Sequence, residues 1–366
     1  MRRNIGKGSL SFLLVLCALL LSSRPSAQTQ SPIITIDAPG ATRGTVATAI
    51  NASGVIAGYY FASDGTHGFV RNLDGTFVSF DSPLGPSAGQ IVPMSINNAG
   101  VITGFYNDPN FGSFGNGAVH GFVRKPDSTF TTFDAPIDPS NPTPGTLPYS
   151  INSAGQIAGR YWICNVQDNP CTDGFLRQPD GTIATFAAPN GQGSTWTQGI
   201  DAAGAVAGYF VDLTNFTEHG FLRAPDATFT VIDVPGAPPG TAITAINARG
   251  ETAGTFLNTQ YSNHGFLRSP NGTFTVFDVP AACSGCFQVA GVNDAGTVAG
   301  TFQDGIDDST QVFLRFADGT FTNFSPGNRS GYALVAGINS SNSVVGTYQD
   351  ANGAPHGYLR SGNAGN

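Results

Sequence analysis

Histidine and aspartate recur at matched positions along this chain, and they are its first candidates for acid–base chemistry. All five histidines precede a Gly-Phe or Gly-Tyr pair. An aspartate stands at a matching place in each case, giving the pairs His67 with Asp81, His120 with Asp134, His219 with Asp233, His264 with Asp278, and His356 with Asp37. Two further copies of the pattern have Asp173 and Gln311 in place of histidine. Their acid positions hold Ala187 and Ser325. Because both members are lost together, we predict a repeated structural His–Asp hydrogen bond rather than one catalytic dyad.

Arginine also recurs, four residues after each histidine position. The seven residues are Arg71, Arg124, Arg177, Arg223, Arg268, Arg315 and Arg360. A ring of arginines can bind phosphate, but a residue present in every copy of a repeat is expected to build that repeat. We predict that these arginines are structural and pair with acids in nearby turns. The expected acids are Asp74, Asp127, Asp180 and Asp318.

The cysteines of the chain predict two local disulfides. Cys164 lies close to Cys171, and Cys283 lies close to Cys286. In an exported protein such neighbours are expected to be oxidised. The Cys283-Ser-Gly-Cys286 segment also has the spacing of a redox or metal motif, but no second Cys or His pair accompanies it at ligand spacing.

Other catalytic signatures are weak. A glycosidase needs paired carboxylates, yet Glu218 and Glu251 are the two glutamates of the sequence. Neither a His-Glu-x-x-His motif nor a phosphate-binding loop is present. The acids Asp304, Asp307 and Asp308 weakly resemble a calcium loop, but they lack the alternating ligands of an EF-hand. We therefore predict neither a metal site nor a cofactor.

The elements that position these residues follow from a phrase repeated seven times. It reads Ile-Asn-x-x-Gly-x-x-Ala-Gly, then a variable stretch, then His-Gly-Phe-Leu-Arg, then Asp-Gly-Thr-Phe-Thr-x-Phe-Asp. Its Asn or Asp falls at Asn51, Asn97, Asn152, Asp201, Asn247, Asn293 and Asn339. The period is 46 residues, with two longer units of 55 and 49. This period is typical of a four-stranded propeller blade.

The first unit contains four predicted strands, at residues 45–51, 55–60, 67–72 and 76–81. The last unit lacks its fourth strand, and the segment Ile33–Gly40 matches the missing piece. We therefore predict an all-β fold, a seven-bladed β-propeller of four-stranded antiparallel blades. Its N-terminal strand is expected to complete the last blade, so that no unpaired edge is left at the junction.

The phrase resembles the HAF-type extracellular repeat family of bacterial secreted proteins. The resemblance rests on Ile-Asn-x-x-Gly-x-x-Ala-Gly and the later His-Gly-Phe-Leu-Arg, and it covers residues 33–360. The family's His-Ala-Phe appears here as His-Gly-Phe, and the sixth unit has Gln-Val-Phe. The resemblance implies export and a repeat fold, and it supplies no catalytic motif.

The first 27 residues have the pattern of a secretory signal peptide. A basic start with Arg2, Arg3 and Lys7 precedes an apolar run from Leu10 to Leu21. We expect a single domain over residues 28–366, secreted to the periplasm or the extracellular space, with no membrane span. The chain carries a formal charge of −8. Losing four basic residues with the signal makes this charge more negative, so nucleic acid is not an expected partner.

Departures from the phrase indicate where a ligand could bind. The longest variable segments belong to the second, third and fourth units, and aromatic residues gather in them or at their edges. They are Phe111, Phe114, Tyr149, Tyr161, Trp162 and Trp196. Aromatic rings with few nearby charges are typical of surfaces that stack on sugars. Alternatively, these rings cap the core or fill the central channel.

The sequence thus favours a binding or scaffold module for a carbohydrate or cell-wall polymer. An extracellular enzyme acting on polysaccharide, a hydrolase or a lyase, is the alternative from another class. A self-associating surface or matrix component is a third. The sequence leaves the oligomeric state open.

Overall fold

The computed structural model describes residues 31–109, 118–136, 145–163, 171–238, 240–260, 262–280, 282–307, 309–327 and 332–362. The predicted signal peptide, residues 1–27, lies outside these ranges. Within them, no helix is long and apolar enough to cross a membrane.

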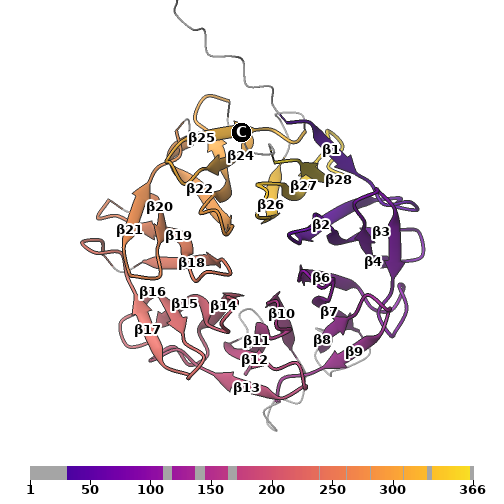
Figure 1. Ribbon diagram of the computed structural model, residues 1–366, viewed down its shortest axis with the longest axis horizontal. Helices are drawn as coiled ribbons and strands as arrows, with labels where there is room; N and C mark the ends of the chain where they lie inside the picture. The colour runs from indigo at the N-terminus through magenta and orange to yellow at the C-terminus, as the bar shows by residue number, and fades with distance from the viewer. Residues whose placement is uncertain are drawn as a thin grey trace, which may run out of the picture. The chain divides into compact units, whose positions relative to one another are not determined.

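The described residues from Ile33 onward form seven four-stranded antiparallel sheets arranged in a ring (Figure 1). The innermost strands are β2 (Gly44–Ile50), β6 (Ile91–Ile96), β10 (Thr146–Ile151), β14 (Thr195–Ile200), β18 (Thr241–Ile246), β22 (Ala282–Val292) and β26 (Ala333–Ile338). The second strands are β3 (Ile56–Phe61), β7 (Ile102–Asp108), β11 (Ile157–Trp162), β15 (Val206–Asp212), β19 (Thr252–Leu257), β23 (Val298–Asp304) and β27 (Val344–Gln349).

The third strands are β4 (Thr66–Arg71), β8 (Ala118–Arg124), β12 (Thr172–Arg177), β16 (Thr217–Arg223), β20 (Asn263–Arg268), β24 (Thr310–Arg315) and β28 (Pro355–Arg360). The outermost strands are β5 (Phe77–Phe80), β9 (Phe130–Phe133), β13 (Ile183–Phe186), β17 (Phe229–Ile232), β21 (Phe274–Phe277), β25 (Phe321–Phe324) and β1 (Ile33–Ile36). Blades are numbered 1 to 7 from the blade of β2. The predicted seven-bladed propeller is confirmed.

The ring closes through the N-terminal strand. β1 pairs antiparallel with β28, so that blade 7 has the strand order β1-β28-β27-β26. Asp37, directly after β1, accepts a hydrogen bond from His356 at the start of β28, with 2.7 Å between Nδ1 and Oδ1. Ile36 is fully buried in the core between blades 7 and 1. The predicted completion of the last blade is therefore present.

A β-bulge in every blade explains the Ala-Gly pair of the phrase. The pairing of the first two strands shifts by one residue at the same place in all seven blades, as between Ala47 and Ala49. The bulge brings a main-chain carbonyl oxygen of the first strand close to the glycine opposite it on the second strand. In blade 1 a Cβ on Gly58 would collide with the carbonyl oxygen of Val46 and with the ring of Phe69. A residue without a side chain is required there.

The core consists of apolar clusters shared between neighbouring blades. Between blades 3 and 4, for example, Ala158 and Leu176 pack with Phe210 and Phe221. Both faces of each sheet are thereby covered, which accounts for strands that are apolar at nearly every position.

Five of the seven repeated arginines stack on an aromatic ring of the preceding blade, a contact that the sequence did not predict. Where the outermost strand of the preceding blade ends in Phe, the guanidinium carbon lies 4.7–5.2 Å from that ring's centroid. The pairs are Arg124 on Phe80, Arg177 on Phe133, Arg223 on Phe186, Arg315 on Phe277, and Arg360 on Phe324. The predicted turn acids interact with these arginines electrostatically, as Asp127 does with Arg124, and they also accept hydrogen bonds from threonine, as Asp74 does from Thr76. Since the strand ends are buried between blades, the flat cation meets a ring more readily than a solvated acid.

Candidate functional site

The His–Asp pairs are repeated contacts inside the blades. Nδ1 of histidine lies 2.6–2.9 Å from the aspartate in His67–Asp81, His120–Asp134, His219–Asp233, His264–Asp278 and His356–Asp37. Each imidazole also lies against an aromatic ring of the second strand. In blades 1, 4 and 5 the second ring nitrogen is hydrogen-bonded as well, to Asp64, Thr217 and Asn258. In these three blades both nitrogens are engaged, which suits a structural role better than proton transfer.

The two blades without histidine use other contacts at the same place. In blade 3, Asp173 is buried, and its carboxylate accepts a hydrogen bond from the main-chain nitrogen of Gly193 at 2.8 Å. Burial raises the pKa of Asp173, while this hydrogen bond opposes the shift. In blade 6 the side-chain amide of Gln311 donates to Asp304 at 2.7 Å. The position is therefore occupied by a polar anchor in both exceptions.

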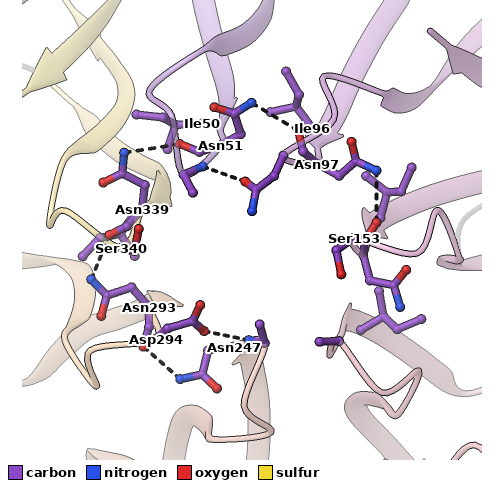
Figure 2. A pocket seen from close by; sticks show the side chains of 18 of the residues that line it. Ile50, Asn51, Ile96, Asn97, Ser153, Asn247, Asn293, Asp294, Asn339 and Ser340 are labelled. Carbon is purple, nitrogen blue, oxygen red and sulfur yellow. Dashed lines mark hydrogen bonds between the residues drawn. The ribbon is translucent and has the colours of Figure 1, made fainter.

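A ring of asparagines surrounds one end of the central channel (Figure 2). The side-chain oxygen Oδ1 of each asparagine accepts a main-chain hydrogen bond from its own turn. In blade 1, for example, Oδ1 of Asn51 accepts from the N–H of Val55. Each Nδ2 donates to the main-chain oxygen of the equivalent residue in the next blade. The bonds run from Asn51 to Asn97 (3.2 Å), Asn97 to Asn152 (3.1 Å), Asn152 to Asp201 (3.0 Å), Asn247 to Asn293 (2.8 Å), Asn293 to Asn339 (2.8 Å), and Asn339 to Asn51 (3.3 Å).

Asp201 interrupts this ring, because a carboxylate has no N–H to donate to the oxygen of Asn247. Its Oδ1 still accepts from Ala205 in its own turn at 2.7 Å. The ring encloses a cavity of ≈ 250 Å³. Since its members recur in the blades and bond to one another, this end of the channel is part of the scaffold.

An apolar collar contributes to the lining of that cavity and of a second one of ≈ 230 Å³. The collar consists of Ile50, Ile96, Ile151, Ile200, Ile246, Val292 and Ile338, the last residues of the innermost strands. Beyond it, the residue at the bulge of six blades lines the second cavity. These residues are Met94, Tyr149, Gln198, Thr244, Ala290 and Ala336. They differ in chemistry from blade to blade, unlike the residues around them, so the channel wall here is free to serve a ligand.

Blades 3 and 4 carry a group of aromatic and charged side chains that begins at Tyr149, which lines this cavity. We call Tyr149, Arg160, Trp196, Tyr209 and Glu218 the blade 3–4 cluster. The guanidinium carbon of Arg160 lies 5.1 Å from the centroid of the Tyr149 ring. Trp196 stacks on Tyr209, its partner across the β14–β15 hairpin, with centroids 5.2 Å apart and planes 14° from parallel.

Tyr209 connects the Trp196 stack with Arg160, because both Arg160 and Glu218 lie close enough to affect its phenol. Burial raises the pKa of its phenol, the Glu218 carboxylate raises it further, and Arg160 opposes the shift. Burial likewise raises the pKa of Tyr149 against the effect of Arg160. Burial also raises the pKa of Glu218, against the nearby His219. The cluster therefore offers two protonated phenols, a guanidinium, a carboxyl group and a flat indole within one region.

The structure brings together two of the six aromatic residues predicted from the sequence. Tyr149 and Trp196 belong to the blade 3–4 cluster. Tyr161 instead packs against the core between blades 2 and 3, at the repeat position where Tyr60 stacks on His67. The Trp162 ring lies over Gly145, and the main-chain N–H of Trp162 donates to the main-chain oxygen of Gly145. Phe111 and Phe114 lie outside the described residues.

The predicted Cys283–Cys286 disulfide is present at the start of β22. Cys171 is also disulfide-bonded, whereas Cys164 lies outside the described residues.

Sequence reasoning missed Arg160, Tyr209 and Glu218, although a signal for Arg160 exists. It follows the Ala-Gly pair of the phrase, where the other six blades have uncharged residues, namely Tyr59, Phe105, Tyr209, Thr255, Thr301 and Thr347. The departures predicted to bind a ligand lie in loops or at their edges, whereas Arg160 lies inside a regular strand.

Several solved structures share the fold. A streptogramin B lyase structure is 15% identical, with a TM-score of 0.58 over 91% of this chain and 98% of that one. A virginiamycin B lyase from Staphylococcus aureus is 14% identical, with a TM-score of 0.54 over 90% and 99%. The β-propeller domain of the Trilobed protease from Pyrococcus furiosus is 10% identical, with a TM-score of 0.55 over 87% and 96%. No family model matches the chain, and no curated protein matches it either. At these identities the likeness extends to the propeller fold alone.

Proposed function

We propose that this protein is an exported binding module that holds a carbohydrate polymer at the blade 3–4 cluster. The single observation that carries the proposal is the Trp196–Tyr209 stack, which Arg160 links to Tyr149 at the wall of an open channel cavity. Two parallel rings held across a hairpin form a rigid platform, and such a platform binds the apolar face of a sugar with little loss of side-chain entropy.

The size of the channel supports a ligand that extends beyond it. The two cavities measure ≈ 250 and ≈ 230 Å³, below the range of about 300–1,000 Å³ that encloses a drug-sized ligand. A single sugar unit at the channel mouth, with the rest of the polymer outside, fits this limit.

Export is supported by the signal-like residues 1–27 and by the resemblance to HAF-type repeats. The disulfide Cys283–Cys286 suits an oxidising compartment.

The test is a binding measurement on a panel of immobilised polysaccharides, with a turnover assay on the same samples. We expect Trp196→Ala to weaken binding about tenfold or more, equivalent to losing roughly 1.5 kcal/mol of apolar contact. Leu73→Ala is the matched control, because Leu73 is an apolar residue, 69% exposed, in the turn between β4 and β5, away from the cluster. Equal affinities of the wild type and the Trp196 variant would refute the assignment, and release of product would favour an enzyme.

A further inference from the structure

Arg160 is a cation that the propeller scaffold does not require. The repeated arginines end the third strand of each blade and stack between blades. Arg160 lies instead in the middle of β11, where it pairs with Leu147 and Gly174. At this position three other blades have threonine and the same bulged hairpin. The hairpin therefore forms without a charge.

The guanidinium of Arg160 lacks a carboxylate partner among the described residues. Its Nε is buried and makes no hydrogen bond there. The Nε atoms of Arg177 and Arg315 are also unbonded, but those guanidiniums donate to a neighbouring carbonyl, whereas the guanidinium of Arg160 contacts the ring and the hydroxyl of Tyr149. Arg249, by contrast, is bridged to Glu251 at 3.0 Å. Arg160 thus carries a positive charge with no ion-pair partner among the described residues, within electrostatic range of Tyr209.

We propose that Arg160 binds the carboxylate of an acidic sugar, so that the ligand is a polymer containing uronic acid. This inference rests on the proposed carbohydrate-binding function. A guanidinium donates two parallel hydrogen bonds to a carboxylate, which fixes the orientation of the sugar as well as its charge. The sugar ring then lies against the outer face of the Trp196–Tyr209 stack.

The surrounding charges favour one carboxylate over a more highly charged anion. The chain carries a net charge of −8, and Glu218 lies in the same cluster, within electrostatic range of Tyr209. The negative charges of Glu218 and of the protein repel any anionic polymer, and they repel a polysulfated chain more strongly than one with a single carboxylate per sugar, which a single guanidinium can neutralise. Glu218 and the two phenols can bond to sugar hydroxyls on the other side of the ring.

The experiment compares polygalacturonate, alginate and oxidised cellulose, each with its methyl ester, and adds a neutral glucan carrying sulfate esters. Calorimetry is performed on the full chain and on Arg160→Gln, Arg160→Lys and the control Arg249→Gln. We expect the wild type to bind at least one free acid about tenfold more tightly than its ester. Arg160→Gln removes this preference, Arg160→Lys retains part of it, and Arg249→Gln leaves it unchanged.

The outcomes separate this inference from the proposed function. The inference is overturned if the wild type binds acid and ester equally well, or if it prefers the sulfated glucan. In either case the proposed function still holds if binding depends on Trp196. Binding to none of the polymers overturns both. If Arg160→Gln does not fold, the wild-type comparison of acid with ester still decides. If a folded Arg160→Gln variant still prefers the free acid over its ester, the carboxylate binds elsewhere and the inference is overturned.

Discussion

The substitution Asp201→Asn should complete the asparagine ring and stabilise the propeller. Asp201 lacks the N–H donor with which its six counterparts bond to the next blade. Its side chain nevertheless has the orientation of theirs, since its Oδ1 still accepts from the N–H of Ala205. Its Oδ2 faces Gly250 of the next turn. An amide at residue 201 can therefore donate to the main-chain oxygen of Asn247 with little rearrangement.

The expected gain is that of one hydrogen bond between neutral groups, about 0.5–1.5 kcal/mol. The oxygen of Asn247 already accepts from Gly250 in its own turn, so the new bond uses its second lone pair. Unfolding entropy of roughly 2 cal/mol/K per residue over about 330 folded residues converts 1 kcal/mol to about 1.5 °C. The predicted rise of the unfolding midpoint is thus about 1–2 °C.

Differential scanning calorimetry at pH 7 measures this shift, and Asn97→Asp is the matched control. That variant removes the donor to Asn152 and places a carboxylate in a buried position. It should lower the free energy of unfolding by about 1–3 kcal/mol. The reasoning is wrong if Asp201→Asn leaves the midpoint unchanged or lowers it while Asn97→Asp behaves as expected, because the inter-blade bond would then contribute nothing measurable.

Two further predictions concern the contacts within and between blades. Replacing Arg124, which stacks on Phe80, by Lys should lower the free energy of unfolding by about 0.5–2 kcal/mol. Arg268→Lys should cost less, because the preceding strand β17 ends in Ile232 and the ring that Arg268 meets, Phe274 of its own blade, lies farther away at 5.9 Å; equal losses in urea titrations would contradict the stacking argument. The hydrogen bond to Asp134 raises the pKa of His120 against burial. This stabilisation is complete below the unfolded value of about 6.5 and is lost as pH rises through the folded value. His120→Gln should therefore lower the thermal midpoint more at pH 6 than at pH 8.5, and a pH-independent difference would exclude the ionic contribution.

The blade architecture could be predicted because every unit contains the same local signals. In unit one the strands predicted at residues 45–51 and 55–60 correspond to β2 and β3 within one residue at each end. The turn between them forms as expected, with Asn51 accepting main-chain bonds and Gly54 at φ +90°. Such turns depend on residues next to one another in the sequence, and seven copies make the signal stronger.

Contacts between blades were harder to predict, because they join residues about one repeat apart. The Asn51 amide bonds to the oxygen of Asn97, 46 residues away, and nothing within one phrase indicates this second role. The stacking of Arg124 on Phe80 depends in the same way on two different units. The blade 3–4 cluster is also non-local, since Arg160 and Tyr209 approach through the packing of neighbouring blades.

The seven bulges place one residue per blade outside the strand pairing that builds the fold. A bulged residue stands outside the strand ladder, and none of those lining the channel belongs to the described core clusters. Tyr149 and Ala290 thus occupy equivalent places in blades of nearly identical backbone pairing. One position per blade can consequently mutate at little cost to the fold. The same scaffold can acquire a new ligand by substitutions at a few sites, and the repeats need not diverge elsewhere.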